Sequence, residues 1–201
     1  MRITGRASIH DVLWNFARAE FEDSLGADRH TQPVIPERLR VKLTRGDRRN
    51  LSSDDWRRVE KGLLSTRGTI VKPVLDRVRE WSLVELHRKE LPDLRVMNLR
   101  IFSSVAPSRR LDDFAAALDR GEFPAVWDPA FYRDLRARFD LRRMHGVPIL
   151  VAARRGGPYT VVEGTTRMSV MASKLETREL NARAVPAVLG LGGLLKGWEW
   201  L

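Results

Sequence analysis

The segment Tyr-Thr-Val-Val-Glu-Gly-Thr-Thr-Arg-Met at residues 159–168 most constrains how this chain can fold. Its β-branched, apolar beginning ends in Glu163 and Gly164, and a helix-compatible Thr-Thr-Arg segment follows at once. This order predicts a strand that turns sharply into a helix. The first backbone N–H groups of such a helix have no intrahelical acceptor and lie at the positive end of its dipole, so the corner can bind an anion.

The side chains of this corner suit a phosphate group. Gly164 lets the backbone approach a ligand closely, Thr165 and Thr166 offer hydroxyls, and Arg167 offers a forked donor. The alternative interpretation is structural: Gly164 only makes the turn, a threonine caps the helix, and Arg167 lies in solvent. A short Gly-Thr-Thr-Arg string does not decide between the two.

Composition narrows the classes of partner and chemistry. The chain has 36 basic and 26 acidic residues, a net charge of +10, and only six lysines among its basic residues. Arginine binds phosphates bidentately, so the excess favours a nucleotide or nucleic acid, although coding bias in the genome is an alternative. The absence of cysteine excludes disulfides, thiolate metal sites and thiol catalysis. The four histidines lack the short spacing of a zinc-binding pair.

Length and hydropathy predict a soluble, cytoplasmic protein without a membrane partner. The N-terminal residues have no apolar segment of signal-peptide length, and no run of about 18 apolar residues occurs. The apolar content of 43% over 201 residues is sufficient for one domain with an appendage. We predict a basic, mainly helical N-terminal extension at residues 1–78 and a second domain at residues 79–201.

The N-terminal extension carries several local signals. Helical spacing predicts a helix at residues 9–23 behind a Ser8 cap, and Gly and Pro residues predict a loop at 26–36. Ser52 and Asp55 form a variant capping box for a helix to about residue 65, and a short strand is expected at 68–71. Alternating basic and apolar residues at 37–49 predict a strand with one basic face, whose candidate nucleic-acid contacts are Arg38, Arg40, Arg48 and Arg49.

The second domain alternates strands and helices. Periodicity and turn residues predict strands at 81–86, 147–153, 159–163 and 185–189, a turn or helical stub at 89–94, and helices at 111–120, 129–145 and 166–175. The strands at 147–153 and 159–163 are expected to form a hairpin. Trp198 and Trp200 alternate as in a strand, and this tail either packs on the body or contacts a homodimer or other protein partner.

The order of these elements resembles the ParB/sulfiredoxin superfamily. The resemblance rests on the helix that ends near Gly146, the Val-Pro-Ile-Leu-Val strand at 147–151, the hairpin, the Gly-x-x-Arg corner at 164–167 and the Val-Pro strand at 185–189. It implies an α+β fold with a small mixed sheet and flanking helices over about residues 79–190. It also implies a nucleotide phosphate cradle formed by Gly164, Thr165, Thr166 and Arg167, with Arg109 or Arg110 as a second arginine.

Departures from the family pattern reduce the number of superfamily reactions that we expect of this chain. Sulfiredoxins have a reactive cysteine directly after this glycine, and Thr165 at that position excludes their reaction. The two threonines, and the lack of a following helix-turn-helix region, make a chromosome-partitioning role unexpected. Free-serine kinases of the superfamily have an acid where Glu163 lies, but a histidine where Thr166 lies. Glu163 can therefore bind magnesium, orient a hydroxyl or act as a base, or it simply pairs with an arginine.

These observations predict a protein that binds ATP or CTP with Mg²⁺ and hydrolyses the nucleotide or transfers its terminal phosphate. Glu163 is the expected catalytic and metal-orienting acid, and Arg167 is expected to stabilise charge. The alternative is an arginine-rich protein, nuclease-like or non-catalytic, that binds DNA or RNA through its N-terminal half. A third hypothesis is an interaction module in which the corner is vestigial and the tryptophan tail binds a partner.

Overall fold

The computed structural model describes residues 1–23, 36–45, 50–141, 144, 146–199 and 201, and the predicted loop at 26–36 falls almost wholly outside them. The described elements are, in chain order, β1 Arg2–Arg6, α1 Ile9–Asp23, α2 Glu37–Thr44, α3 Ser53–Arg77, β2 Glu80–His87, η2 Arg88–Asp93, β3 Leu94–Val96, α4 Arg100–Ser103, α5 Leu111–Asp119, α6 Pro129–Arg138, β4 Ile149–Ala152, β5 Tyr159–Glu163, α7 Thr165–Glu176, β6 Ala184–Leu191 and η4 Gly193–Leu195.

One mixed sheet of six strands organises the fold, in the order β1-β2-β6-β4-β5-β3. β4 and β5 pair antiparallel, which confirms the predicted hairpin, while β3 pairs parallel with β5 and β4 pairs parallel with β6. β5 is buried along its first four residues because it has a strand on each side. The α+β class is thus confirmed, and the ParB/sulfiredoxin assignment stays a prediction.

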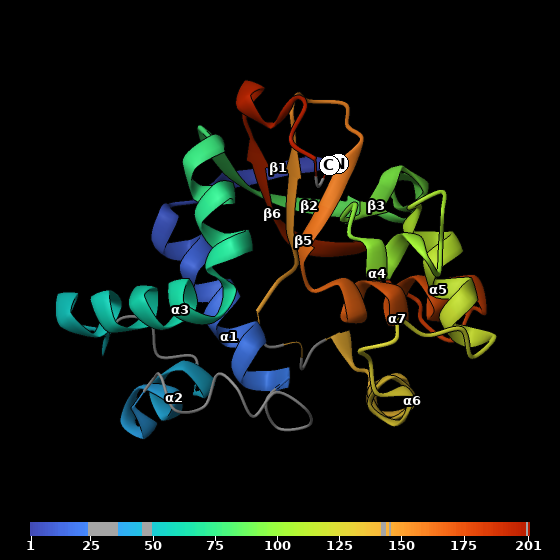
Figure 1. Cartoon of the computed structure of the whole chain (residues 1–201), viewed down its shortest axis with the longest axis horizontal. Helices are drawn as coiled ribbons and strands as arrows, with labels where there is room; N and C mark the ends of the chain where they lie inside the picture. The colour runs from blue at the N-terminus through green and yellow to red at the C-terminus, as the bar shows by residue number, and fades with distance from the viewer. Residues whose placement is uncertain (24–35, 46–49, 142–143, 145, 200) are drawn as a thin grey trace.

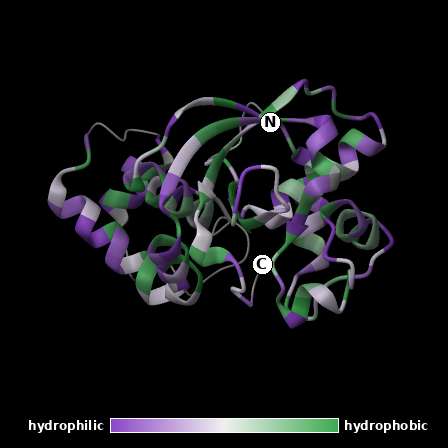
Figure 2. Cartoon of the chain, turned by 90° about the horizontal axis from the view of Figure 1, so that it is seen from above, coloured by the Kyte–Doolittle hydropathy of each residue, from purple (hydrophilic) through white to green (hydrophobic). Residues whose placement is uncertain are grey.

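The helices form two groups. Figure 1 shows α1, α2 and α3 together on the left, α5, α6 and α7 together on the right, and the strands between them. Both groups carry alternating purple and green bands in Figure 2, as expected for helices with one apolar face. Within the described residues, no helix is long and apolar enough to cross a membrane.

A single apolar core joins the two predicted segments. It includes Phe16 and Leu63 from the N-terminal helices together with Val161, Val170 and Leu189 from the sheet and α7. β1, which the sequence did not predict, adds residues 2–6 to the edge of the same sheet through antiparallel pairing with β2. Residues from both sides of position 78 share this core, and the division of the chain into two domains at that position stays a prediction.

The helix α3 is longer than expected. Its capping box is confirmed, because the Asp55 amide donates to Ser52 Oγ over 3.1 Å and the Ser52 amide donates to Asp55 Oδ2 over 3.2 Å. The predicted strand at 68–71 is wrong, since α3 continues to Arg77. Val71 and Val74, three residues apart, are both fully buried, so packing against the core overrides the β-branched composition.

Residues 37–44 form the helix α2, and the predicted strand at 37–49 is wrong over this stretch. Leu39 and Leu43, four residues apart, are both fully buried. Their spacing suits one face of a helix as well as alternate positions of a strand, which explains the error. On a helix, Arg38 and Arg40 do not share a face: Arg38 is exposed and Arg40 is half-buried.

Two C-terminal predictions also need correction. The helix predicted at 129–145 ends at Arg138, after a start with Pro129 in its first turn and the Asp128 carboxylate as cap. The described part of the tail is not a strand but the 3₁₀ turn η4 followed by Trp198, while Trp200 lies outside the described residues. The Trp198 ring is partly buried against the core and lies 5.7 Å from the Arg77 guanidinium, so this tryptophan is packed.

Candidate functional site

The predicted strand-to-helix corner is confirmed. β5 ends at Glu163, Gly164 is the N-cap with φ of +86°, and α7 begins at Thr165. A left-handed φ favours glycine, and a Cβ at this position would lie 3.3 Å from Arg167 Nη2 and 3.4 Å from the Pro148 backbone. Glycine is therefore required both for the turn and for the close packing beside it.

Glu163 and Arg167 form an ion pair beneath the corner. The Gly164 amide donates to Glu163 Oε1 over 2.7 Å, and Arg167 Nη2 lies 3.4 Å from the same oxygen. Glu163 thus has an arginine partner, while its catalytic and metal-binding roles stay predictions. The interpretation that placed Arg167 in solvent is wrong, because this residue is only 4% exposed.

Arg167 is held from its other side by the N-terminal helix. Its Nη1 donates to the Gly146 carbonyl over 3.2 Å, and the adjacent Val147 amide donates to Asn15 Oδ1 over 2.9 Å. Gly146 has φ of +74°, and a Cβ there would lie 3.0 Å from the Asn15 carbonyl. The buried Asn15 on α1 therefore holds the loop at residues 146–147 in place. This loop binds Arg167, and Arg167 orients Glu163.

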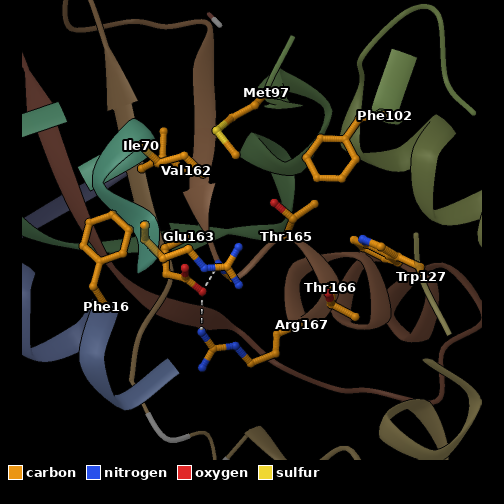
Figure 3. Close-up of a pocket in the computed structure, with 12 residues that line it drawn as sticks. Phe16, Ile70, Met97, Phe102, Trp127, Val162, Glu163, Thr165, Thr166 and Arg167 are labelled. Atoms are coloured by element: carbon orange, nitrogen blue, oxygen red, sulfur yellow. Dashed lines mark hydrogen bonds and ion pairs between the residues drawn. The ribbon is translucent and has the colours of Figure 1, made fainter. Parts of the chain in front are cut away.

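A pocket of about 140 Å³ opens above this ion pair. Figure 3 shows Phe16 and Ile70 on one side, Phe102 and Trp127 on the other, and Glu163 and Thr165 between them. The complete lining comes from α1, α3, the β3–α5 region, the segment before α6 and the corner: Phe16, Arg67, Ile70, Met97, Phe102, Trp127, Val162, Glu163, Gly164, Thr165, Thr166 and Arg167. All five corner residues predicted from sequence therefore meet in one cavity.

Thr165 and Thr166 supply hydroxyls to this pocket. Thr165 is 8% exposed, and in the part of the chain that the structure describes neither threonine hydroxyl has a hydrogen-bond partner. The Thr165 hydroxyl points toward the space bounded by Met97, Phe102 and Glu163 (Figure 3). Both hydroxyls are therefore available to a ligand or to water that enters the pocket.

Arg67 is the charged pocket residue that sequence analysis missed, in addition to the apolar lining. It lies on α3 and is the residue of that helix with non-helical dihedrals, at φ −121° and ψ 17°. The sequence did indicate an irregular helix at this point. The predicted helix ended near residue 65, where the polar Ser-Thr-Arg-Gly segment at 65–68 begins. What the sequence could not show is that the long helix α3 would bring this position beside the end of β5.

Arg109 and Arg110, the expected second arginines, do not line this pocket. Arg109 has φ of +59°, and its Nη1 donates to the Leu201 main-chain oxygen over 2.6 Å. Arg110 forms a bidentate pair with Asp112, with Nε–Oδ1 at 3.0 Å and Nη2–Oδ2 at 2.5 Å. Both arginines therefore have structural partners away from the corner, and their phosphate role stays a prediction.

Two of the four predicted nucleic-acid arginines, Arg38 and Arg40, lie among the described residues. Arg38 Nη2 lies 3.7 Å from Asp55 Oδ1, and Arg40 is half-buried on α2. Arg48 and Arg49 lie outside the described residues. Lys42 also pairs with Asp55 at 2.9 Å, and its hydrogen bond is the main reason that the pKa of Asp55 is lowered from its usual value. The described contacts thus stabilise the start of α3.

A second polar cluster lies toward the C-terminal end of α7 and is called here the Asp119 network. Asp119 accepts hydrogen bonds from the Tyr132 hydroxyl at 3.1 Å and from Ser173 Oγ at 2.6 Å, while Arg136 Nη2 pairs with Glu179 at 2.7 Å. Hydrogen bonds from Arg136, Thr177 and Lys174 lower the pKa of Glu179 to about 2. Burial, assisted by Asp119, raises the pKa of Tyr132. These groups satisfy one another.

The described residues contain no group of three or more His, Asp or Glu side chains able to hold a metal ion. Comparisons of the chain with protein-family models, curated proteins and solved structures gave no match. The functional argument therefore rests on the pocket at the start of α7.

Proposed function

We propose that this protein binds ATP or CTP with Mg²⁺ at the pocket beside Gly164 and hydrolyses the nucleotide or transfers its terminal phosphate. The observation that carries the proposal is a pocket at a helix N-terminus that is lined by Thr165, Thr166 and two arginines. The order α6, β4, β5, corner, α7, β6 further supports a ParB/sulfiredoxin-like nucleotide site.

Mg²⁺ fits this site as part of the nucleotide complex. Magnesium keeps several waters and commonly binds through one or two carboxylates together with substrate phosphates. Glu163 supplies one carboxylate at the pocket, so phosphate oxygens and water would complete the shell. The same ion would offset the repulsion between the Glu163 carboxylate and a neighbouring phosphate, because both are anions.

The contacts divide the chemical roles between two residues. Glu163 lies at the pocket wall and can accept the proton of an attacking hydroxyl, from water or from an acceptor molecule. The attacking oxygen would then bond to the terminal phosphorus while the bond to the bridging oxygen breaks, and the nucleoside diphosphate would leave. Arg167 is already bound to Gly146 and Glu163, so we assign it a positioning role.

Calorimetric titration with Mg·ATP and Mg·CTP tests binding. The Thr165→Val variant keeps the shape of the side chain and removes its hydroxyl, and we expect about 10-fold weaker binding from the loss of one hydrogen bond to a charged group. Thr69→Val is the matched control, because Thr69 lies on α3, is exposed and does not line this pocket. Absence of binding of both nucleotides to the wild-type chain would overturn the proposal.

A further inference from the structure

A groove of about 580 Å³ lies between α3 and the tail that follows β6, and we call it the tail groove. In Figure 1 the red tail lies beside the green end of α3. The side chains that form its two walls are Thr69, Pro73, Arg77, Leu194, Lys196 and Trp198. Thr69, Pro73 and Arg77 recur every four residues, so they share one face of α3. The tail groove has no lining residue in common with the pocket at the corner and is therefore a separate site.

The walls of the tail groove are held together by close packing. A Cβ on Gly192 would lie 2.1 Å from the Arg77 carbonyl oxygen, so the main chains of the tail and α3 approach more closely than a side chain allows. Leu195 is fully buried in the core, and Asn98 Nδ2 donates to the Glu199 carbonyl over 2.8 Å. A ligand would therefore meet walls that are already in place, which reduces the cost of ordering the chain on binding.

The tail groove exposes apolar surface. Leu194 is 56% exposed, whereas the next residue, Leu195, is fully buried, so the turn η4 places one leucine in the core and leaves the other at the groove. Pro73 and Trp198 line the same groove and are partly exposed. Covering this surface with an apolar side chain of a ligand would remove it from water.

Two cations lie beside this apolar surface. In the part of the chain that the structure describes, neither Arg77 nor Lys196 forms an ion pair with a carboxylate, and the Arg77 guanidinium instead lies 5.7 Å from the Trp198 ring. Glu199 is the third charged residue of the lining, so two positive charges and one negative charge give a formal sum of +1. Charge complementarity therefore favours a ligand that carries carboxylates.

We infer that the tail groove is a docking site for a peptide segment of another protein in which acidic and apolar side chains are neighbours. The volume falls within the range of about 300–1,000 Å³ that is usual for binding sites. A second copy of this chain is a poor occupant, because its net charge of +10 repels a like copy.

Single-stranded nucleic acid also carries negative charge, but it binds by stacking its bases on aromatic rings. The ring of Trp198 is partly buried and has the Arg77 guanidinium near it, whereas Leu194 and Pro73 offer aliphatic surface. The observations thus favour a peptide. This inference does not depend on the proposed function, because the two sites have different linings.

Fluorescence anisotropy with labelled peptides tests the inference on the full chain. The probe is a peptide of Glu-Glu-Leu repeats, and its matched counterparts have Lys-Lys-Leu and Glu-Glu-Ser repeats. We expect the wild-type chain to bind the Glu-Glu-Leu peptide about 10-fold more tightly than either counterpart, and to bind it more weakly as salt is added.

Two pairs of variants locate the binding. Lys196→Glu should weaken binding about 10-fold, because the change removes one exposed ion pair and adds a repulsion of similar size. Lys61→Glu is its control, since Lys61 is exposed on α3 and does not line the groove. Leu194→Ser should weaken binding about 5-fold through lost apolar contact. Its control is Val126→Ser, because Val126 is 72% exposed and lies outside the groove.

Several outcomes would overturn the inference. Absence of binding to the wild-type chain, or equal binding of the acidic and basic peptides, would remove the docking site. Equal weakening by Lys196→Glu and Lys61→Glu would assign the binding to overall charge. Displacement of the peptide by oligothymidylate, with tighter binding of the oligonucleotide, would make the groove a nucleic-acid site. All four variants change exposed side chains, and unchanged melting temperatures would confirm that they fold.

Discussion

The two ends of α7 carry charged clusters of opposite character. At its N-terminal end, Glu163 and Arg167 lie under a cavity that also exposes the Thr165 hydroxyl and Arg67. Toward its C-terminal end, the Asp119 network joins Asp119, Tyr132, Arg136, Ser173 and Glu179 through hydrogen bonds and ion pairs. The first cluster lines a cavity of about 140 Å³ together with the two corner threonines. The groups of the second cluster bond to one another, although Asp119 and Ser173 also border a cavity of about 390 Å³.

This difference shows why charge density alone does not locate a functional site. The strongest downward pKa shift with a stated value belongs to Glu179, in the cluster whose charges are matched within the protein. Structural ion-pair networks perturb pKa values as readily as active sites do. Hydroxyl and charged side chains that line one cavity at a helix N-terminus are the more discriminating sign.

The largest expected effect tests the N-terminal cluster. Glu163→Gln keeps an oxygen that can accept from the Gly164 amide but removes the carboxylate base. We expect single-turnover phosphate release to slow about 100- to 10,000-fold, the usual contribution of a general base. Glu176→Gln is the control, as Glu176 is an exposed acid on the same helix. An unchanged rate in Glu163→Gln would remove this residue from the chemistry.

Gly164→Ala separates backbone strain from crowding. A left-handed alanine costs about 1–2 kcal/mol, and the new Cβ would lie 3.3 Å from Arg167 Nη2. Gly121→Ala is the matched control, with φ of +87° and nothing within 4 Å of its Cβ. We expect Gly164→Ala to lose more stability in urea unfolding than the control, and to weaken nucleotide binding. Equal losses in the two variants would show that the corner tolerates a side chain.

Asp119→Ala tests the C-terminal cluster. The change removes the acceptor of the Tyr132 and Ser173 hydroxyls and should cost about 1–2 kcal/mol of unfolding free energy. Nucleotide affinity should not change, because Asp119 does not line the pocket at the corner. Tyr132→Phe, which removes one of these hydrogen bonds, should cost less. A drop in nucleotide affinity comparable to that of Thr165→Val would show that the cluster at the C-terminal end of α7 also contributes to binding.

The smallest expected effect is on the stability of the protein at acidic pH. The pKa of Glu179 is lowered from 4.5 to about 2, so its contribution to stability is present above pH 4.5 and is lost as the pH falls toward 2. The melting temperature of Glu179→Gln should therefore lie slightly below that of the wild type at neutral pH and converge with it near pH 2. A difference that stays constant over this range would assign the loss to packing rather than to charge.

Local patterns predicted the elements whose own residues determine them. The helix at 9–23, the capping box of Ser52 and Asp55, and the corner at Gly164 follow from spacing, caps and a glycine, and the structure confirms each. The helix at 37–44 was not predicted by its local pattern. Leu39 and Leu43 are four residues apart, a spacing that places them on one face of a helix and equally on one face of a strand. Tertiary burial decided between them.

The site was predictable only where it is contiguous in sequence. The corner at 163–167 could be recognised, whereas Arg67 joins it through the packing of a kinked helix from a distant part of the chain. Arg109 was predicted as a phosphate-binding residue from its order in the chain. Its side chain instead donates to the main-chain oxygen of Leu201 in the C-terminal tail. Such long-range placements have no local signal in a single sequence.

The proposed nucleotide would contact segments that are far apart in the chain. The pocket draws its walls from α1, α3, α4 and α7, so a bound nucleotide would act as a non-covalent cross-link between these segments. Any ligand that binds only the folded state lowers the population of the globally opened state as its concentration rises. Amide hydrogen exchange in α1 and α3 should then slow together with that of α7, which makes the N-terminal helices reporters of events at the corner.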